Sequence, residues 1–223
     1  FKNAKLSKKL FLEQLNFTLT DSQKTVLEDL QNDFIKGMPM NRLLQGDVGC
    51  GKTVVATMAA IDCVEEGFQV AFMAPTEILA EQHYEKIKTW FKDAAYEIIL
   101  LTGSMPKKEK LLAYQKIEKG NANIVIGTHA LFQESVTFNN LGFYIIDEQH
   151  RFGVEQRMML KNKSKIKQEY EPHQLMMSAT PIPRTLSMSF FAHMDVSTIK
   201  ELPGGRRPIT TKIYLDDKRK QLL

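Results

Sequence analysis

The sequence predicts a three-layer α/β fold, in which helices cover both faces of a mainly parallel central sheet. Short, nearly unbroken apolar runs alternate with stretches that have apolar residues at helical spacing. Runs of this kind are typical of strands that are covered on both faces. Small or polar residues follow each apolar run. This is expected where the carboxyl ends of parallel strands form one ligand-binding edge.

Two helices and a strand are expected first. Residues 1–17 have apolar positions at helical spacing and predict an amphipathic helix. A second helix should take Thr20 or Asp21 as its N-cap, run through SQKTVLEDLQNDFI, and end at Gly37 and Pro39. The apolar run LLQ then predicts the first strand, directly before a glycine-rich stretch.

Strands and helices alternate over most of the remaining chain. The expected helices are VVATMAAIDCVEE, ILAEQHYEKIKTWF and KKEKLLAYQKIEKG. The expected strands are FQVAFMA (68–74), YEIILL (96–101), NIVIGT (123–128), FYIIDE (143–148) and QLMMSA (174–179). Strands joined through helices lie parallel, with right-handed crossovers.

The composition is that of an ordinary globular protein with a slight basic excess. The 223 residues include 30 Lys and Arg against 26 Asp and Glu, a formal net charge of +4. This balance is compatible with a nucleic-acid partner but does not demonstrate one. No apolar run is long enough to cross a bilayer, and no membrane partner is expected. The two cysteines lack metal-site spacing, so free thiols in the cytoplasm are expected.

The glycine-rich stretch GDVGCGKT has the spacing of a phosphate-binding loop between a strand and a helix. Backbone N–H groups in such a loop surround a polyphosphate at the N-terminus of a helix. Lys52 would reach the β- and γ-phosphates, and the hydroxyl of Thr53 would bind Mg²⁺. Cys50 is either a small residue that suits the turn, which is the favoured interpretation, or a thiol with a pKa lowered by the helix N-terminus. The loop comprises Gly46, Asp47, Val48, Gly49, Cys50, Gly51, Lys52 and Thr53.

Two carboxylates follow the apolar strand FYII. Asp147 would hold the Mg²⁺, directly or through water, and Glu148 would orient and deprotonate the attacking water. The alternative is a pair of solvated acids that ends a strand. A kinase for a small substrate would also need the loop and a carboxylate.

SATPIP places two hydroxyls, Ser178 and Thr180, at the end of another strand. They could transmit phosphate occupancy to a substrate surface. Ser and Thr are also common in ordinary turns.

These motifs together resemble superfamily-two helicases, and most closely the RecG-type ATP-dependent branched-DNA helicases. The resemblance covers about residues 17–210 and rests on long phrases: LLQGDVGCGKTVVA, MAPTEILAEQH, IGTHALFQ, IIDEQHRFGVEQR, ATPIPRTL and DVSTIKELPGGRRPI. It implies a RecA-like P-loop NTPase domain that binds ATP and Mg²⁺, hydrolyses ATP and acts on DNA forks and junctions. Cys50 departs from the serine of the family, and Ser178 stands where many relatives have threonine.

The resemblance also implies roles for individual residues. Gln23 would read the adenine edge, with Phe17 packed on the ring, and Glu148 and Lys52 would be catalytic. Gln149 and His150, with Ser178 and Thr180, would couple the phosphates to the DNA. Arg151, Phe152 and Arg157 are as consistent with a solvated helix start as with a DNA contact. The expected contacts to the DNA backbone are Pro75, Thr76, Glu77, Gly103, Ser104, Thr128 and His129.

The domain organisation is expected to be that of a fragment. Residues 1–16 would end a preceding linker or helix, 17–202 would form the first motor domain, and 203–223 would be a linker and the start of a second motor domain. That second domain would supply an arginine finger, and a DNA-binding wedge domain would precede residue 1. The expected function is the remodelling of stalled forks and Holliday junctions in bacterial repair and recombination, at the nucleoid. The alternatives are a transcription-repair coupling translocase and a nucleotide-gated DNA-binding module without turnover of its own.

Overall fold

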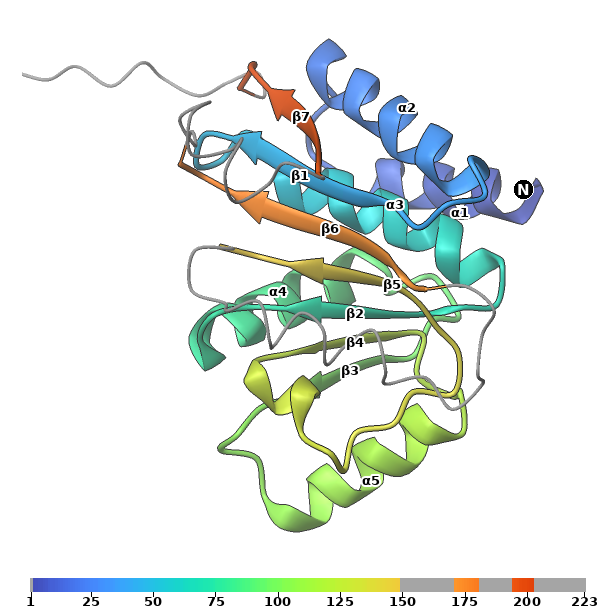
Figure 1. Cartoon of the computed structure of the whole chain (residues 1–223), viewed down its shortest axis with the longest axis vertical. Helices are drawn as coiled ribbons and strands as arrows, with labels where there is room; N and C mark the ends of the chain where they lie inside the picture. The colour runs from blue at the N-terminus through green and yellow to red at the C-terminus, as the bar shows by residue number, and fades with distance from the viewer. Residues whose placement is uncertain (1, 149–170, 181–193, 203–223) are drawn as a thin grey trace, which may run out of the picture.

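The computed structural model describes residues 2–148, 171–180 and 194–202, which form an α/β fold around a seven-stranded sheet (Figure 1). The strand order is β3-β4-β2-β5-β6-β1-β7, and all the pairings are parallel. The strands are β1 (Asn41–Gly46), β2 (Gln69–Met73), β3 (Ile98–Leu101), β4 (Ile124–Gly127), β5 (Leu141–Ile146), β6 (His173–Ser178) and β7 (Asp195–Ile199). The expected parallel α/β class is therefore confirmed, together with all six expected strands.

The helices begin and end close to where the sequence predicts. Thr20 is the N-cap of the second helix, and its hydroxyl accepts a hydrogen bond from Gln23 N while the Gln23 side chain accepts one from Thr20 N. This capping box satisfies two backbone donors that the first turn leaves free. The helices are α1 (Lys2–Glu13), α2 (Asp21–Ile35), α3 (Lys52–Glu65), α4 (Glu77–Trp90) and α5 (Lys107–Glu118), with a short 3₁₀ helix η1 (His129–Phe132).

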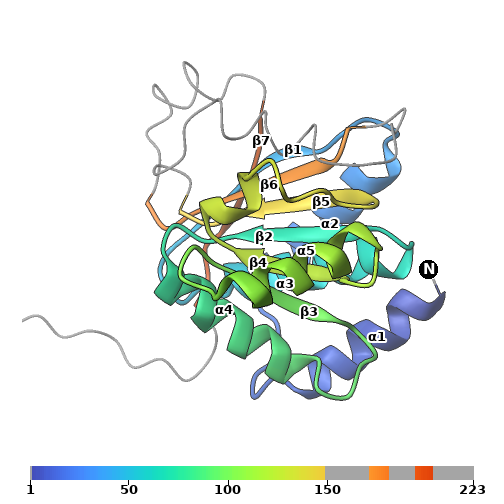
Figure 2. The same ribbon diagram turned by 90° about the horizontal axis from the view of Figure 1, so that it is seen from below.

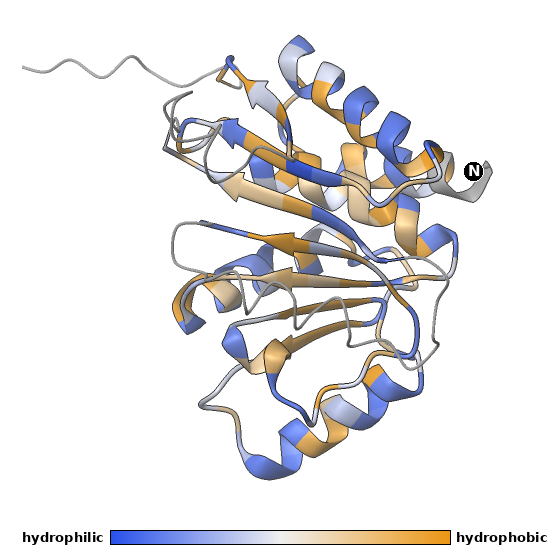
Figure 3. Cartoon of the chain, in the orientation of Figure 1, coloured by the Kyte–Doolittle hydropathy of each residue, from blue (hydrophilic) through white to orange (hydrophobic). Residues whose placement is uncertain are grey.

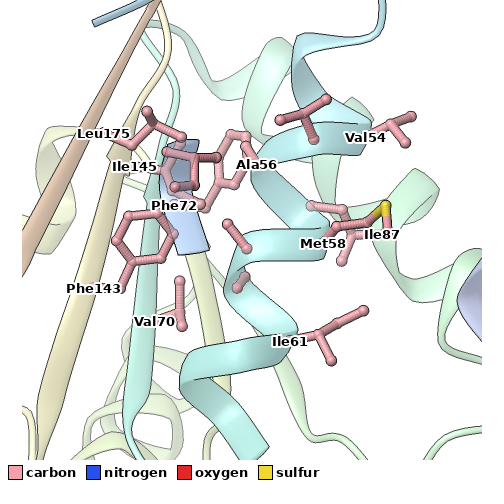
Figure 4. Packing of buried hydrophobic residues seen from close by; sticks show 14 of the residues in the cluster. Val54, Ala56, Met58, Ile61, Val70, Phe72, Ile87, Phe143, Ile145 and Leu175 are labelled. Atoms are coloured by element: carbon pink, nitrogen blue, oxygen red, sulfur yellow. The ribbon is translucent and has the colours of Figure 1, made fainter. Parts of the chain in front are cut away.

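Two apolar clusters lie on opposite faces of the sheet, because successive residues of a strand point to opposite sides. Val70 and Phe72 of β2 join one cluster, and Ala71 and Met73 join the other. On the first face α3 packs against β2 and β5, as the side chains in Figure 4 show. Figure 2 shows α1, α3 and α4 on this same face, and the other face carries α5 and η1. The apolar strands thus form the centre of three layers (Figure 3).

Helix α1 packs on the domain through Phe11, which is buried against Trp90 and Phe91. Lys8 also forms an ion pair with Asp62 of α3. The boundary expected at residue 17 stays a prediction, although this contact makes α1 part of the same core. No helix of the described residues has the length and apolarity that a bilayer crossing requires.

Strand β7 was not predicted, because it lacks the continuous apolar run of the other strands. Only two of its positions are buried, Ser197 and Ile199, and the others are exposed. An ionic network holds it at the edge of the sheet beside β1. Arg42 donates to Asp33 over 2.6 Å and to Ser197 Oγ over 2.9 Å, and Ser197 donates to Asp29 over 2.6 Å. Since these side chains come from α2, β1 and β7, the network fixes the edge strand against the second helix.

Candidate nucleotide-binding and catalytic site

All seven strands point the same way, so their carboxyl ends share one edge of the sheet (Figure 1). The phosphate loop follows β1 at this edge, and Asp147 follows β5. Strand β6 lies between β1 and β5, and its last residue, Ser178, is paired with Gln45, directly before Gly46. The edge therefore gathers the loop, the acidic pair and Ser178, as the sequence predicts.

The phosphate loop turns from β1 into α3, and two of its glycines adopt positive φ angles. These are +80° at Gly49 and +92° at Gly51, the N-cap of α3. At Gly51 any other residue would be strained, and its Cβ would lie 2.2 Å from the Gln23 Nε2 atom. Asp47, Val48 and Gly49 are exposed at the tip of the loop. The glycine spacing thus makes a tight, accessible turn at a helix N-terminus.

The ammonium group of Lys52 lies over the loop that precedes it. Its Nζ atom donates to the carbonyl of Gly46 over 2.6 Å and to the carbonyl of Asp47 over 3.1 Å. Asp47 also accepts hydrogen bonds from Val48 N and Cys50 N, which close the turn. The positive charge therefore lies against the backbone of the loop, and its contact with a polyphosphate stays a prediction.

Gln23 connects α2 to the phosphate loop. Its side chain is fully buried, and its Nε2 atom donates to the Cys50 carbonyl over 2.7 Å. Its Oε1 atom accepts from Thr20 N over 2.9 Å. Phe17, the expected partner of the adenine ring, is half-buried and packs against the larger apolar cluster. The contact of Gln23 with the loop was not predicted, since it joins residues far apart in the sequence.

Cys50 is buried, with its Sγ atom behind the loop. A Cβ added at Gly46 would lie 2.5 Å from that sulfur and 3.3 Å from Ile199 Cβ. Burial raises the pKa of the Cys50 thiol, and the nearby charge of Lys52 offsets this only in part. This burial favours the interpretation of Cys50 as a small residue that fills the turn. The alternative of a lowered thiol pKa is not supported, because removal from water disfavours the thiolate more than the Lys52 charge and the backbone hydrogen bonds favour it.

Asp147 is held by three contacts. Its backbone N–H donates to the Met73 carbonyl over 2.8 Å, which extends the pairing of β5 with β2. Its Oδ1 atom accepts from Glu148 N over 3.1 Å, and its Oδ2 atom lies 2.9 Å from His83 Nε2. His83 comes from α4, and its ring packs on Phe72 with 4.8 Å between the centroids. No function was predicted for His83, although it ends the phrase APTEILAEQH.

Glu148 adopts a φ of +52°, unlike every other non-glycine residue of the described part. Such a conformation costs about 1–3 kcal/mol and is found mainly at functional sites. The backbone therefore leaves the extended conformation at the end of β5. Gln149 and His150, with Arg151, Phe152 and Arg157, lie outside the described residues.

The residues expected to bind DNA follow β2, β3 and β4 at the same edge. The Thr76 hydroxyl caps α4 by accepting from Leu79 N over 3.3 Å. Glu77 accepts from Ser104 N over 2.9 Å, and this hydrogen bond holds the turn after β3 against α4. Hydrogen bonds from Ser104 lower the pKa of Glu77, so this carboxylate stays charged at neutral pH. The structure thus engages Glu77 within the protein, where it orders the turn.

The other expected DNA contacts differ in exposure. Gly103 and His129 are exposed, and Pro75 is half-buried after β2. Thr128 is buried, and its Oγ1 atom has no hydrogen-bond partner among the described residues.

Ser178 and Thr180 form a local turn. The two hydroxyl oxygens are 3.1 Å apart, and Thr180 N donates to Ser178 Oγ over 3.3 Å. Ser178 is buried, whereas Thr180 is exposed. The buried hydroxyl therefore lies beside the strand that leads into the phosphate loop, and the exposed one faces away from the core. Their predicted coupling role stays a prediction.

The donor set of the edge is suited to Mg²⁺. Thr53 offers a hydroxyl and Asp147 a carboxylate, the hard oxygen ligands that Mg²⁺ prefers. Among the described residues no cluster of three or more His, Cys, Asp or Glu could hold a metal ion without help from a ligand.

The parallel sheet and its phosphate loop define a P-loop nucleotide-binding domain of the RecA-like class. The family model for DEAD/DEAH box helicases matches residues 20–189. The chain therefore belongs to the DEAD/DEAH box helicase family, and membership of this family implies the use of ATP.

Individual relatives give a finer resemblance. The chain is 51% identical over 216 residues to "ATP-dependent DNA helicase RecG" of Haemophilus influenzae, covering 97% of this chain and 31% of the relative. It is 47% identical over 221 residues to the protein of the same name from Escherichia coli K12, covering 99% of this chain and 32% of the relative. A solved structure of RecG bound to a three-way DNA junction superposes with a TM-score of 0.82 at 43% identity, covering 98% of this chain and 28% of that one.

The predicted resemblance to RecG-type helicases is thus confirmed. The chain spans about a third of the length of these two curated relatives.

Proposed function

We propose that this chain forms the ATP-binding half of the motor in an ATP-dependent DNA helicase that remodels stalled forks and Holliday junctions. One observation carries the proposal. A phosphate loop and the Asp147–Glu148 pair, with a positive φ at Glu148, share one sheet edge in a chain with high identity to RecG proteins. The RecG structure bound to a three-way junction supports branched DNA as the partner. We place the protein in the bacterial cytoplasm, at the nucleoid.

The phosphate loop would bind the polyphosphate of ATP through its backbone N–H groups and the N-terminus of α3. The Lys52 ammonium, now shared between the Gly46 and Asp47 carbonyls, would exchange those oxygens for phosphate oxygens. Gln23 would read the adenine with the hydrogen of Nε2 that does not face Cys50 O, and Phe17 would pack on the ring. The loop and α2 would thus bind the two ends of the nucleotide.

Thr53 and Asp147 would hold Mg²⁺, and the bound ion would neutralise part of the negative charge of the phosphates. Glu148 would accept the proton of the attacking water. The positive φ of Glu148 supports this role, since strained backbone conformations cluster at functional sites.

The turns after β2, β3 and β4 would bind the phosphodiester backbone of one DNA strand. Backbone N–H groups and hydroxyls suit a grip that does not depend on base sequence. Glu77 would act there by holding the Ser104 turn in place rather than by facing a phosphate. Residues 17–202 would be the first motor domain, and closure on a second motor domain would supply an arginine finger.

Two substitutions test this assignment in the intact protein. Lys52→Ala removes a charge-assisted contact of about 1.5–3 kcal/mol, so calorimetry should show roughly 10- to 150-fold weaker ATP binding. Glu148→Gln should bind ATP normally and lose about 10²- to 10⁴-fold in turnover, because an amide cannot accept the proton. Unchanged ATP affinity in Lys52→Ala would refute the phosphate-loop assignment. Retained turnover in Glu148→Gln would place the base elsewhere.

A further inference from the structure

His83 reaches the acidic pair from outside the motifs that carry the proposed chemistry. It lies in the middle of α4, and its Nε2 atom is 2.9 Å from Asp147 Oδ2, although 64 residues separate the two in the sequence. A carboxylate only accepts hydrogen bonds, so the imidazole Nε2–H is the donor.

The surroundings of His83 hold the imidazole in place. The ring packs on Phe72 of β2, whose strand is paired with β5, and Phe72 itself is buried. The side chains of His83 and Asp147 are only 12% and 14% exposed, so water competes little for their hydrogen bond. His83 therefore donates from a fixed position on the same apolar face that supports β5.

The contact decides the orientation of the Asp147 carboxylate. Asp147 Oδ1 is turned toward the N–H of Glu148, and Oδ2 is turned toward His83. Without the imidazole, the described residues leave this carboxylate the 3.1 Å hydrogen bond from Glu148 N. The carboxylate could then rotate about χ2, which is a broad and soft torsion in aspartate.

We propose that His83 is a positioning residue for magnesium: it orients the Asp147 carboxylate that would face the Mg²⁺ of bound Mg·ATP. The proposal rests on the proposed function, because it assumes that Asp147 serves the metal. When a group that hydrogen-bonds a metal-binding side chain is removed, metal affinity typically falls by about 10- to 100-fold. His83 fills that position, and it ties the carboxylate to α4.

The test measures ATP affinity of the intact protein by calorimetry, once with Mg²⁺ and once with EDTA. A non-hydrolysable ATP analogue is the ligand, so that turnover does not enter. His83→Leu removes the donor and should lose about tenfold or more of the affinity that Mg²⁺ adds. Its affinity in EDTA should equal that of the unmodified protein. Gln82→Leu, an exposed change on the same helix, is the matched control and should leave both affinities unchanged.

A second pair of variants separates positioning from folding. The amide of glutamine can place an N–H near the position of the imidazole Nε2, whereas that of asparagine is too short. His83→Gln should therefore restore most of the Mg²⁺-dependent gain, and His83→Asn should not. Equal losses with Mg²⁺ and with EDTA, or a full Mg²⁺ gain in His83→Leu and His83→Asn, would overturn the proposal. An unmodified protein that gains no affinity from Mg²⁺ would instead contradict the magnesium site of the proposed function.

Discussion

From its hydrogen bond to Cys50 O we expect Gln23 to stabilise the phosphate loop as well as to read adenine, and the two ends of its amide can be tested separately. Gln23→Glu keeps an oxygen that can accept from Thr20 N, so the capping box survives. It replaces the Nε2 donor by an oxygen that faces the Cys50 carbonyl, where the present hydrogen bond spans 2.7 Å. The substitution therefore breaks the contact with the loop and also buries a carboxyl group, so the loss of this contact alone sets the minimum effect.

The expected loss follows from the burial of this contact. Gln23 is fully buried, so the Cys50 carbonyl would lose its partner out of reach of water, which costs about 1–3 kcal/mol. For a domain of this size each kcal/mol lowers Tm by roughly 2–4 °C, which gives a drop of about 2–12 °C. Gln23→Ala also removes the capping contact and should lose about 1 kcal/mol more.

Thermal unfolding and calorimetry with ATP measure the two effects. Gln31→Glu makes the same charge change on the exposed face of α2 and is the matched control. Gln23→Glu should unfold at a lower temperature than Gln31→Glu and should bind ATP more weakly, with a smaller preference for ATP over GTP. If the two variants unfold at the same temperature and bind ATP with the same affinity, the contact with the Cys50 carbonyl does not support the loop, and the reasoning is refuted.

Three further predictions concern the coupling hydroxyls, pH and the thiols. Ser178→Ala with Thr180→Ala should keep most ATPase activity in the intact protein while fork unwinding falls, and equal proportional losses in both assays would place these hydroxyls in the catalytic site. Burial lowers the pKa of His173 in the folded state, so the free energy of unfolding, measured by urea titration, should fall as pH drops below about 6.5. The variant His173→Gln should lack this part of the pH dependence. A pH profile of the variant that equals that of the unmodified protein would contradict the role of His173. Cys50 and Cys63 are buried with raised thiol pKa values, so both should react slowly with a disulfide reagent until the chain is unfolded, and rapid labelling of the folded protein would be inconsistent with that burial.

Strands β1 to β6 could be predicted because each of them is recognisable from its own residues. Val70, Phe72 and their neighbours in β2 are apolar on both sides, as a doubly covered strand requires. Strand β7 has no such signal, since Asp195 and Val196 are exposed and Ser197 is buried only because Arg42 and Asp29 provide its partners. An edge strand that is held by ionic contacts with residues far away in the sequence has no local sequence pattern from which it could be predicted.

The site could be predicted only where it is built from one stretch of chain. The phosphate loop is one continuous segment, so its glycines and Lys52 are evident from spacing alone. The contacts of Gln23 with Cys50, of His83 with Asp147 and of Glu77 with Ser104 each join segments 27 to 64 residues apart. They depend on how α2 and α4 pack on the sheet, which the sequence does not reveal locally. For Glu77 the packing adds a hydrogen bond from Ser104 N that the sequence did not indicate, and its contact with DNA stays a prediction.

The central claim is that ATP bound at this sheet edge drives work on branched DNA. The most direct measurement is the steady-state ATPase rate of the intact protein without DNA and with fork, single-stranded and linear duplex DNA, with Glu148→Gln as the inactive control. The account predicts that fork DNA stimulates hydrolysis well above linear duplex, and that Glu148→Gln abolishes the stimulated rate. A rate that is the same with and without every DNA would contradict the account.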